Sequence, residues 1–402
     1  MVFFLQLILN TLFSDHVSAD AFITDAPVNS TGLDRVVNFL FSGLNHWDAQ
    51  YFIHITRYGY DTEEKLAFFP GLPLVLRVPA HVIHILSADL LSTYSAVIVA
   101  GFMLNFIFFL LTTVMLFELT HTLFKDAKFA EEAAMWFAFN PASIFFSATY
   151  SESLFSFLTF TGLLLLEKEH IIFANMFFAA SLMTRSNGLL NTGFSLYFIV
   201  RVMLDNSRSC FSKLSFLVIN LWSVFAPISL FYYYQKVFIP ANYCPGMSSC
   251  DEHTKSVWLL PYFVIQKKYW DQGFLRFWQL KQSLNFLIGV PIIAVCLWSA
   301  TSYFIRIKDL LIHAKVYVKE HRFWSHPRLV PYAVHISFLS LTALFFMHVQ
   351  VSVRLLSSSS PWIYWLAASL PTYSLSHKVI KNLFMTYFLL GIALFSNGLP
   401  FT

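Results

Sequence analysis

Long apolar segments separated by short polar ones are the main pattern of this 402-residue chain. A helix that crosses a membrane needs about 20 mostly apolar residues, whereas a strand of a membrane barrel needs about 10 alternating ones. The pattern therefore predicts an all-α polytopic membrane protein with about ten transmembrane helices. The apolar runs fall at residues 1–14, 71–88, 96–118, 130–147, 151–166, 171–184, 189–205, 214–236, 284–305, 329–350 and 383–400.

Two of these runs differ from the others. The run 71–88 contains prolines, histidines and Arg77, which are unfavourable inside a lipid-facing helix, so we expect it to be a membrane-surface or re-entrant segment that does not cross. Residues 1–14 lack a basic segment and a small-residue cleavage site, which favours a short first membrane helix over a signal peptide.

Composition agrees with a membrane protein. Hydrophobic residues make up 57% of the chain and charged residues 12%, against about 45–50% and about 25% in soluble domains. The net charge of +4 gives no indication of nucleic-acid binding. The chain has no glycine-rich phosphate loop, no GxSxG, no HExxH and no CxxC, so neither a metal site nor a cofactor is expected.

The distribution of lysine and arginine predicts the orientation. Segments 119–129, 167–170, 201–213 and 306–328 carry nearly half of the chain's 26 basic residues, which places them in the cytosol. The opposite, luminal side then receives a long first loop at 15–95, a second large loop at 237–283, the turns near Tyr150 and Arg185, and the stretch 352–383. One domain, 1–402, accounts for the whole chain.

The luminal assignment has two further consequences. Asn29-Ser30-Thr31 is the one glycosylation triplet of the chain, and it falls in the first luminal loop. Cys244 and Cys250 share the second luminal loop, where an oxidising environment would allow a disulfide between them.

The first luminal loop contains a candidate catalytic carboxylate. Asp48 follows His46 and Trp47, and aromatic side chains surround this segment. A carboxylate with apolar walls can serve as a general base, but aspartate is also a favoured helix N-cap. The two roles are compatible. Glu63 lies in the same loop.

Polar residues also interrupt the apolar runs on the luminal side. Glu152 follows Tyr150 at the start of a helix, where the helix dipole would favour it or a cavity would receive it. Arg185, with Asn187, and Arg354 could each bind phosphate or extend their charge to the membrane surface.

These charges are expected on one face of the membrane. Asp48, Glu152, Arg185 and Arg354 all reach the luminal side in the predicted topology. Arginines and a carboxylate at a lipid boundary suit the attack of a hydroxyl on a lipid-phosphate donor, because the arginines hold the departing phosphate and the carboxylate takes the proton.

The same segments resemble the PIG-V family, GPI mannosyltransferase 2. The resemblance rests on His46-Trp47-Asp48-Ala49, Gly59-Tyr60, Ala67-Phe68-Phe69-Pro70-Gly71-Leu72-Pro73, Asn140-Pro141-Ala142, Tyr150-Ser151-Glu152, Arg185-Ser186-Asn187-Gly188 and Arg354 with Ser360-Pro361. It implies a GT-C fold in the endoplasmic reticulum membrane, with dolichyl-phosphate mannose as donor. It also implies transfer of the second, α-1,6-linked mannose to the GPI precursor, and a small stabilising subunit.

By this resemblance, Asp48 is the base of a single, inverting displacement. The residues expected to contact substrate are His46, Trp47, Glu63, Tyr150, Glu152, Arg185, Asn187 and Arg354. Three alternatives remain at this point: a transferase of the same architecture acting on protein or N-glycan precursors, a polytopic transporter, and a structural membrane subunit. A transporter would be expected to distribute charges through its spans.

Overall fold

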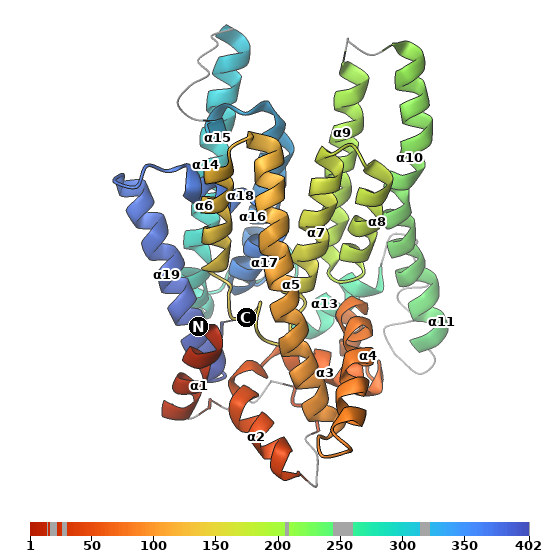
Figure 1. Cartoon of the computed structure of the whole chain (residues 1–402), viewed down its shortest axis with the longest axis vertical. Coiled ribbons are helices and arrows are strands. Elements are labelled where there is room, and N and C mark those ends of the chain that lie inside the picture. The colour runs from red at the N-terminus through yellow and green to blue at the C-terminus, as the bar shows by residue number, and fades with distance from the viewer. Residues whose placement is uncertain are drawn as a thin grey trace.

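The computed structural model describes residues 1–13, 15–16, 22–25, 30–205, 209–243, 260–313 and 322–401. Over these residues the regular secondary structure is helical, without a β-strand. Most helices run along the long axis of the molecule (Figure 1). The helices are α1 (Val2–Leu12), α2 (Gly32–Phe41), α3 (Asp48–Tyr58), α4 (Gly71–Leu86), α5 (Thr93–Phe124), α6 (Ala127–Ala138), α7 (Glu152–Glu167), α8 (Ile171–Leu182), α9 (Thr192–Leu204), α10 (Cys210–Tyr233), α11 (Ile239–Tyr243), α13 (Pro261–Trp270), α14 (Ser283–His313), α15 (Arg322–Ser325), α16 (Val330–Phe345), α17 (Ser352–Ser359), α18 (Trp362–Ser369) and α19 (Leu375–Ser396).

Five helical segments of the described chain are long and apolar enough to cross a membrane, which confirms a polytopic membrane protein. They are Thr93–Phe124, Cys210–Tyr243, Leu280–Lys308, Pro327–Phe345 and Leu375–Ser396. Helices α1 and α4 are shorter, and both lie with α2 and α3 at the lower end of the molecule in Figure 1.

The predicted helix 130–147 is interrupted. Helix α6 stops at Ala138, and the amide of Asn140 donates to Phe137 O (3.0 Å) while its oxygen accepts from Ala142 N (2.8 Å). Pro141 disfavours helical geometry at Asn140, which explains the break. The irregular residues that follow are buried by protein, as such backbone must be at membrane depth. A single helix over 130–147 was therefore the wrong prediction, and the irregular path leads to Tyr150.

The stretch 352–383 was expected on one side of the membrane, and this expectation is also wrong. Helices α17 and α18 are almost completely buried and break at Ser360-Pro361. Leu370, beyond α18, lines a small cavity with Arg306 and Trp324, next to the segment predicted to be cytosolic. The stretch thus passes through the interior, because its apolar side chains find partners among the surrounding helices.

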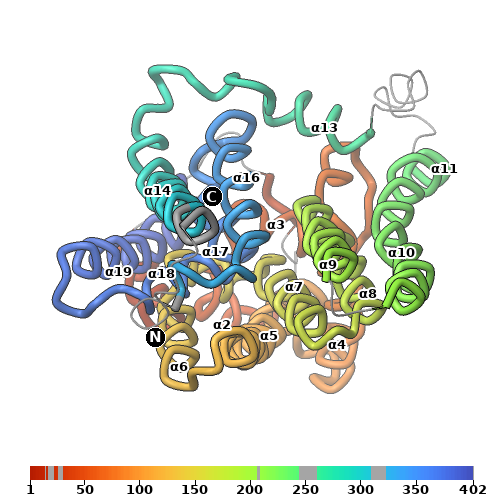
Figure 2. The backbone as a smooth tube through the Cα atoms, turned by 90° about the horizontal axis from the view of Figure 1, so that it is seen from above, coloured from red at the N-terminus to blue at the C-terminus, as the bar shows by residue number. Residues whose placement is uncertain are grey.

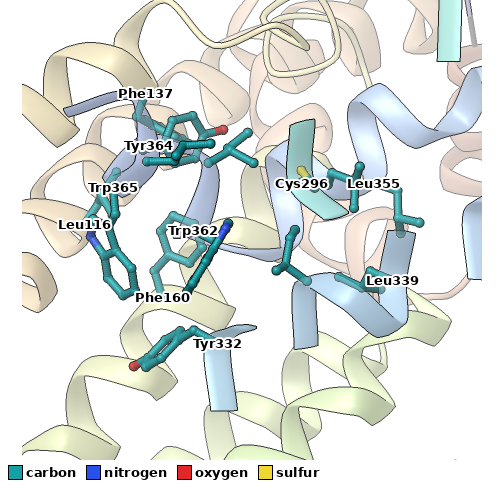
Figure 3. Packing of buried hydrophobic residues seen from close by; sticks show 14 of the residues in the cluster. Leu116, Phe137, Phe160, Cys296, Tyr332, Leu339, Leu355, Trp362, Tyr364 and Trp365 are labelled. Atoms are coloured by element: carbon teal, nitrogen blue, oxygen red, sulfur yellow. The ribbon is translucent and has the colours of Figure 1, made fainter. Parts of the chain in front are cut away.

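Aromatic residues of α18 form the centre of the core (Figure 3). Trp362, Tyr364 and Trp365 are each 0% exposed, and their polar atoms are hydrogen-bonded. Trp362 Nε1 donates to Ser299 Oγ (2.9 Å) in α14, and Trp365 Nε1 donates to Thr120 Oγ1 (2.7 Å) in α5. These bonds join three helices that are distant in sequence, so α18 and the preceding α17 are held in one position.

Candidate active site

The start of α3 is held in an unusual backbone conformation. Trp47 has φ +56°, a region that costs a residue with a side chain about 1–3 kcal/mol. The Tyr150 hydroxyl accepts a hydrogen bond from the N–H of Asp48 (3.0 Å) and donates a long one to the carbonyl of His46 (3.5 Å). Tyr150 is fully buried, and Asn105 of α5 donates to its carbonyl (3.0 Å). The tyrosine thus fixes the peptide that presents Asp48.

Asp48 does not cap α3. It is the first residue of the helix and makes no side-chain capping bond. Its Oδ2 instead lies 2.7 Å from Nη1 of Arg354 in α17. The cap interpretation is therefore wrong, and the carboxylate faces a cation from a segment about 300 residues away in sequence.

Four charged side chains form one continuous series, which we call the charge chain: Asp48, Arg354, Glu152 and Arg185. Arg354 Nη1 lies 3.4 Å from Glu152 Oε1, and Arg185 Nη1 pairs with the same oxygen. Two cations and two anions alternate, so the series is neutral. The prediction that these four residues reach the same face agrees with this geometry.

Burial differs along the charge chain. The side chain of Asp48 is 25% exposed, that of Arg354 is 10% exposed, and that of Glu152 is completely buried. The arginines therefore do not extend to the membrane surface as isolated charges would. Glu152 contacts both guanidinium groups from the interior, while Asp48 is the most exposed member of the charge chain.

Arg185 is held by its own segment and by the residues that precede α7. Its Nη1 donates to Ser151 Oγ (3.3 Å) and its Nε to Asn187 Oδ1 (3.4 Å), while Asn187 Nδ2 donates to Ser359 Oγ (2.8 Å). Asn187 thereby connects the Arg185 segment to the serines that follow Arg354. This role is positional and does not require contact with substrate.

The segment Ala67-Phe68-Phe69-Pro70-Gly71, which we call the AFFPG segment, packs against the residues that precede Arg185. The N–H of Gly71 donates to the carbonyl of Met183 (2.8 Å), and a Cβ at Gly71 would lie 2.7 Å from Thr184 Oγ1. Only glycine fits this close backbone contact. The first turn of α4 therefore supports the residues that directly precede Arg185.

Two further residues predicted to contact substrate, His46 and Glu63, make side-chain contacts outside the charge chain. The ring of His46 lies near Asp15, Phe395 and Gly398, and burial lowers its pKa although the Asp15 charge opposes this effect. Glu63 accepts hydrogen bonds from Lys268 Nζ (2.6 Å) and Tyr269 OH (2.9 Å), so it joins the first loop to α13.

Trp47 flanks Asp48, and its buried Nε1 has no hydrogen-bond partner in the described part of the chain. Asn29, Cys244 and Cys250 lie outside the described residues, so glycosylation and the disulfide remain predictions.

Asn105 and Ser359 also hold the site together, although no motif in the sequence indicated them. Asn105 is the single asparagine of the mostly apolar helix α5, and this alone could have indicated a structural role, because buried polar groups in such helices usually have a partner.

Comparison with known proteins identifies the family of this chain. A family model described as Mannosyltransferase (PIG-V) matches residues 1–402. The chain is 34% identical over 406 residues to GPI alpha-1,6-mannosyltransferase 2 of Cricetulus griseus, covering 91% of this chain and 80% of the relative. It is 30% identical over 471 residues to the protein of the same name from Homo sapiens, covering 99% and 95%. It is also 30% identical over 444 residues to GPI mannosyltransferase 2 of Drosophila melanogaster, covering 100% and 97%. Because the family model matches residues 1–402 of this chain, the chain belongs to the PIG-V family of mannosyltransferases.

Proposed function

We propose that this mannosyltransferase transfers the second, α-1,6-linked mannose from dolichyl-phosphate mannose to the GPI precursor. The reaction takes place at the luminal face of the endoplasmic reticulum membrane, in a GT-C architecture of about ten spans. The names of the relatives support the GPI acceptor and the linkage. The observation that carries the proposal is that Asp48 forms the partly exposed end of a buried series of paired charges.

Asp48 acts as the general base. An acceptor hydroxyl attacks the anomeric carbon of mannose, and its proton passes to the Asp48 carboxylate. The bond between the anomeric carbon and the phosphate oxygen breaks, and its electron pair stays on the phosphate. One displacement inverts the anomeric configuration, so a β-linked donor yields an α-linked product without a covalent intermediate.

The arginines stabilise the charge that develops on the phosphate. A phosphate diester becomes a monoester with additional negative charge, and preorganised cations in a poorly solvated site favour that change. Arg185 and Arg354 are both held by Glu152, so their positions need not reorganise during the reaction. No cofactor is part of this proposal.

A rescue experiment tests the proposal. Cells that lack GPI mannosyltransferase 2 receive the wild-type chain, Asp48→Asn, or the control Asp89→Asn at matched expression. Asp89 belongs to the same predicted first luminal loop, 15–95, as Asp48, but its side chain is 85% exposed. We expect wild type and Asp89→Asn to restore surface GPI-anchored proteins, and Asp48→Asn to leave a precursor with a single mannose.

Two other results would contradict the proposed acceptor or the proposed base. If a well-expressed wild type accumulates the same precursor as untransfected cells, the acceptor is a different one, such as a protein or an N-glycan precursor. If Asp48→Asn rescues as well as wild type, Asp48 is not the base.

A further inference from the structure

The second loop, predicted at 237–283, contributes a tyrosine to the surroundings of the charge chain. Helix α13 and the residues that follow it run along one side of the molecule toward α14 (Figure 2). Tyr262, in the first turn of α13, shares a hydrogen bond of 2.9 Å with the hydroxyl of Ser186. Ser186 directly follows Arg185, so the phenol lies beside the cationic end of the charge chain.

Tyr262 is held firmly in this place. Its backbone N–H donates to Oε1 of the fully buried Gln235 (3.0 Å), and its ring meets the ring of Phe69 edge to face at 5.4 Å. Phe69 belongs to the AFFPG segment, whose Gly71 contacts the residues that precede Arg185. The tyrosine is therefore preorganised by three separate elements of the chain.

The hydroxyl pair retains one proton for a further acceptor. Two hydroxyl groups carry two protons, and a single proton lies between the oxygens of Tyr262 and Ser186. The charges of Arg185, Arg354 and Asp48 all act on the Tyr262 hydroxyl. Burial raises its pKa, and this outweighs the opposite effect of Ser186 and the two arginines, so the phenol stays a neutral donor.

We infer that the Tyr262–Ser186 hydroxyl pair donates a hydrogen bond to the phosphate of the polyprenyl-phosphate donor, and holds the phosphate monoester as it forms. This inference rests on the proposed function. An anion is the expected acceptor, because the adjacent guanidinium of Arg185 attracts negative charge to this place. The bond strengthens as the phosphate gains charge, so it favours the transition state over the bound donor. No proton leaves the tyrosine.

Transfer kinetics of Tyr262→Phe in membranes containing the full chain test this role. The change keeps the ring and its contact with Phe69. Loss of one hydrogen bond to a charged group is expected to lower kcat about ten- to a hundredfold. It should also weaken inhibition by added dolichyl phosphate, and Ser186→Ala should change both quantities in the same direction by a smaller factor.

Tyr269→Phe is the matched control, because Tyr269 belongs to the same helix and its hydroxyl bonds Glu63 instead. It should leave kcat and dolichyl-phosphate inhibition near wild type. The inference is overturned if Tyr262→Phe retains wild-type values of both, or if it changes only the KM of the glycolipid acceptor. Either result can occur while Asp48→Asn is inactive, which leaves the proposed function in place. A wild type that transfers no mannose would instead refute the proposed function.

Discussion

Replacing Tyr150 by phenylalanine removes one hydroxyl and keeps a buried ring packed against Phe145 and Phe395. The N–H of Asp48 then loses its acceptor at 3.0 Å, and the carbonyl of His46 loses a long bond. An unpaired, partly buried N–H costs about 1–3 kcal/mol. The strained φ of Trp47 costs a similar amount, so the peptide before α3 is expected to relax once the hydroxyl is gone.

This relaxation moves Asp48 relative to Arg354 and to the acceptor hydroxyl. If the same energy is lost from the transition state, the rate of mannose transfer falls about five- to 150-fold. The assay is transfer from dolichyl-phosphate mannose in membranes with matched expression, together with thermal unfolding in detergent. Tyr303→Phe is the control, because Tyr303 is also fully buried and its hydroxyl donates to the carbonyl of His326 (2.8 Å), in a segment predicted to be cytosolic. If both variants lose the same activity, or if Tyr150→Phe transfers at the wild-type rate, Tyr150 does not position Asp48.

Three further substitutions test other contacts of the structure. Glu152→Gln removes the buried anion shared by two arginines, and breaking such pairs typically costs about 3–5 kcal/mol. We therefore expect this variant to lose mannose transfer and to unfold at a lower temperature. Wild-type transfer together with a wild-type unfolding temperature would contradict the role given to Glu152. Gly71→Ala places a Cβ 2.7 Å from Thr184 Oγ1 and should destabilise the protein by about 1–3 kcal/mol and slow transfer, whereas Gly193→Ala, with nothing within 4 Å, should do neither. Burial alone would raise the pKa of Asp34, but hydrogen bonds from Ser95, Ser92 and Thr31 lower it, so its contribution to stability is complete above the ordinary value of 3.8 and is lost as the pH falls below it. The difference in unfolding temperature between wild type and Asp34→Asn should therefore shrink in acid, and a constant difference would show that ionisation of Asp34 is not involved.

Much of the architecture follows from local patterns. The apolar runs predicted α5, α7, α8, α9, α10, α14, α16 and α19, because a chain in lipid must satisfy its own backbone hydrogen bonds, whereas the run 130–147 is not a single helix and α17 and α18 were not predicted. Local signals also match helix starts: Ser92 accepts from the N–H of Ser95 before α5, and Asp126 accepts from two N–H groups before α6. The distribution of lysine and arginine predicted that Asp48, Glu152, Arg185 and Arg354 lie on one face, and the structure brings the four side chains into contact.

Only the tertiary structure decided how those charges pair. Asp48 and Arg354 are about 300 residues apart, and the choice between helix cap and ion-pair partner depends on where α17 packs. The break at Asn140, the passage of α17 and α18 through the interior, and the left-handed backbone of Trp47 depend equally on distant partners. Hydrophobic periodicity is a property of neighbouring residues, so it determines which segments become helices. The contacts that orient a guanidinium or hold a strained peptide come from segments that meet only when the helices pack, and local sequence contains no measure of that packing.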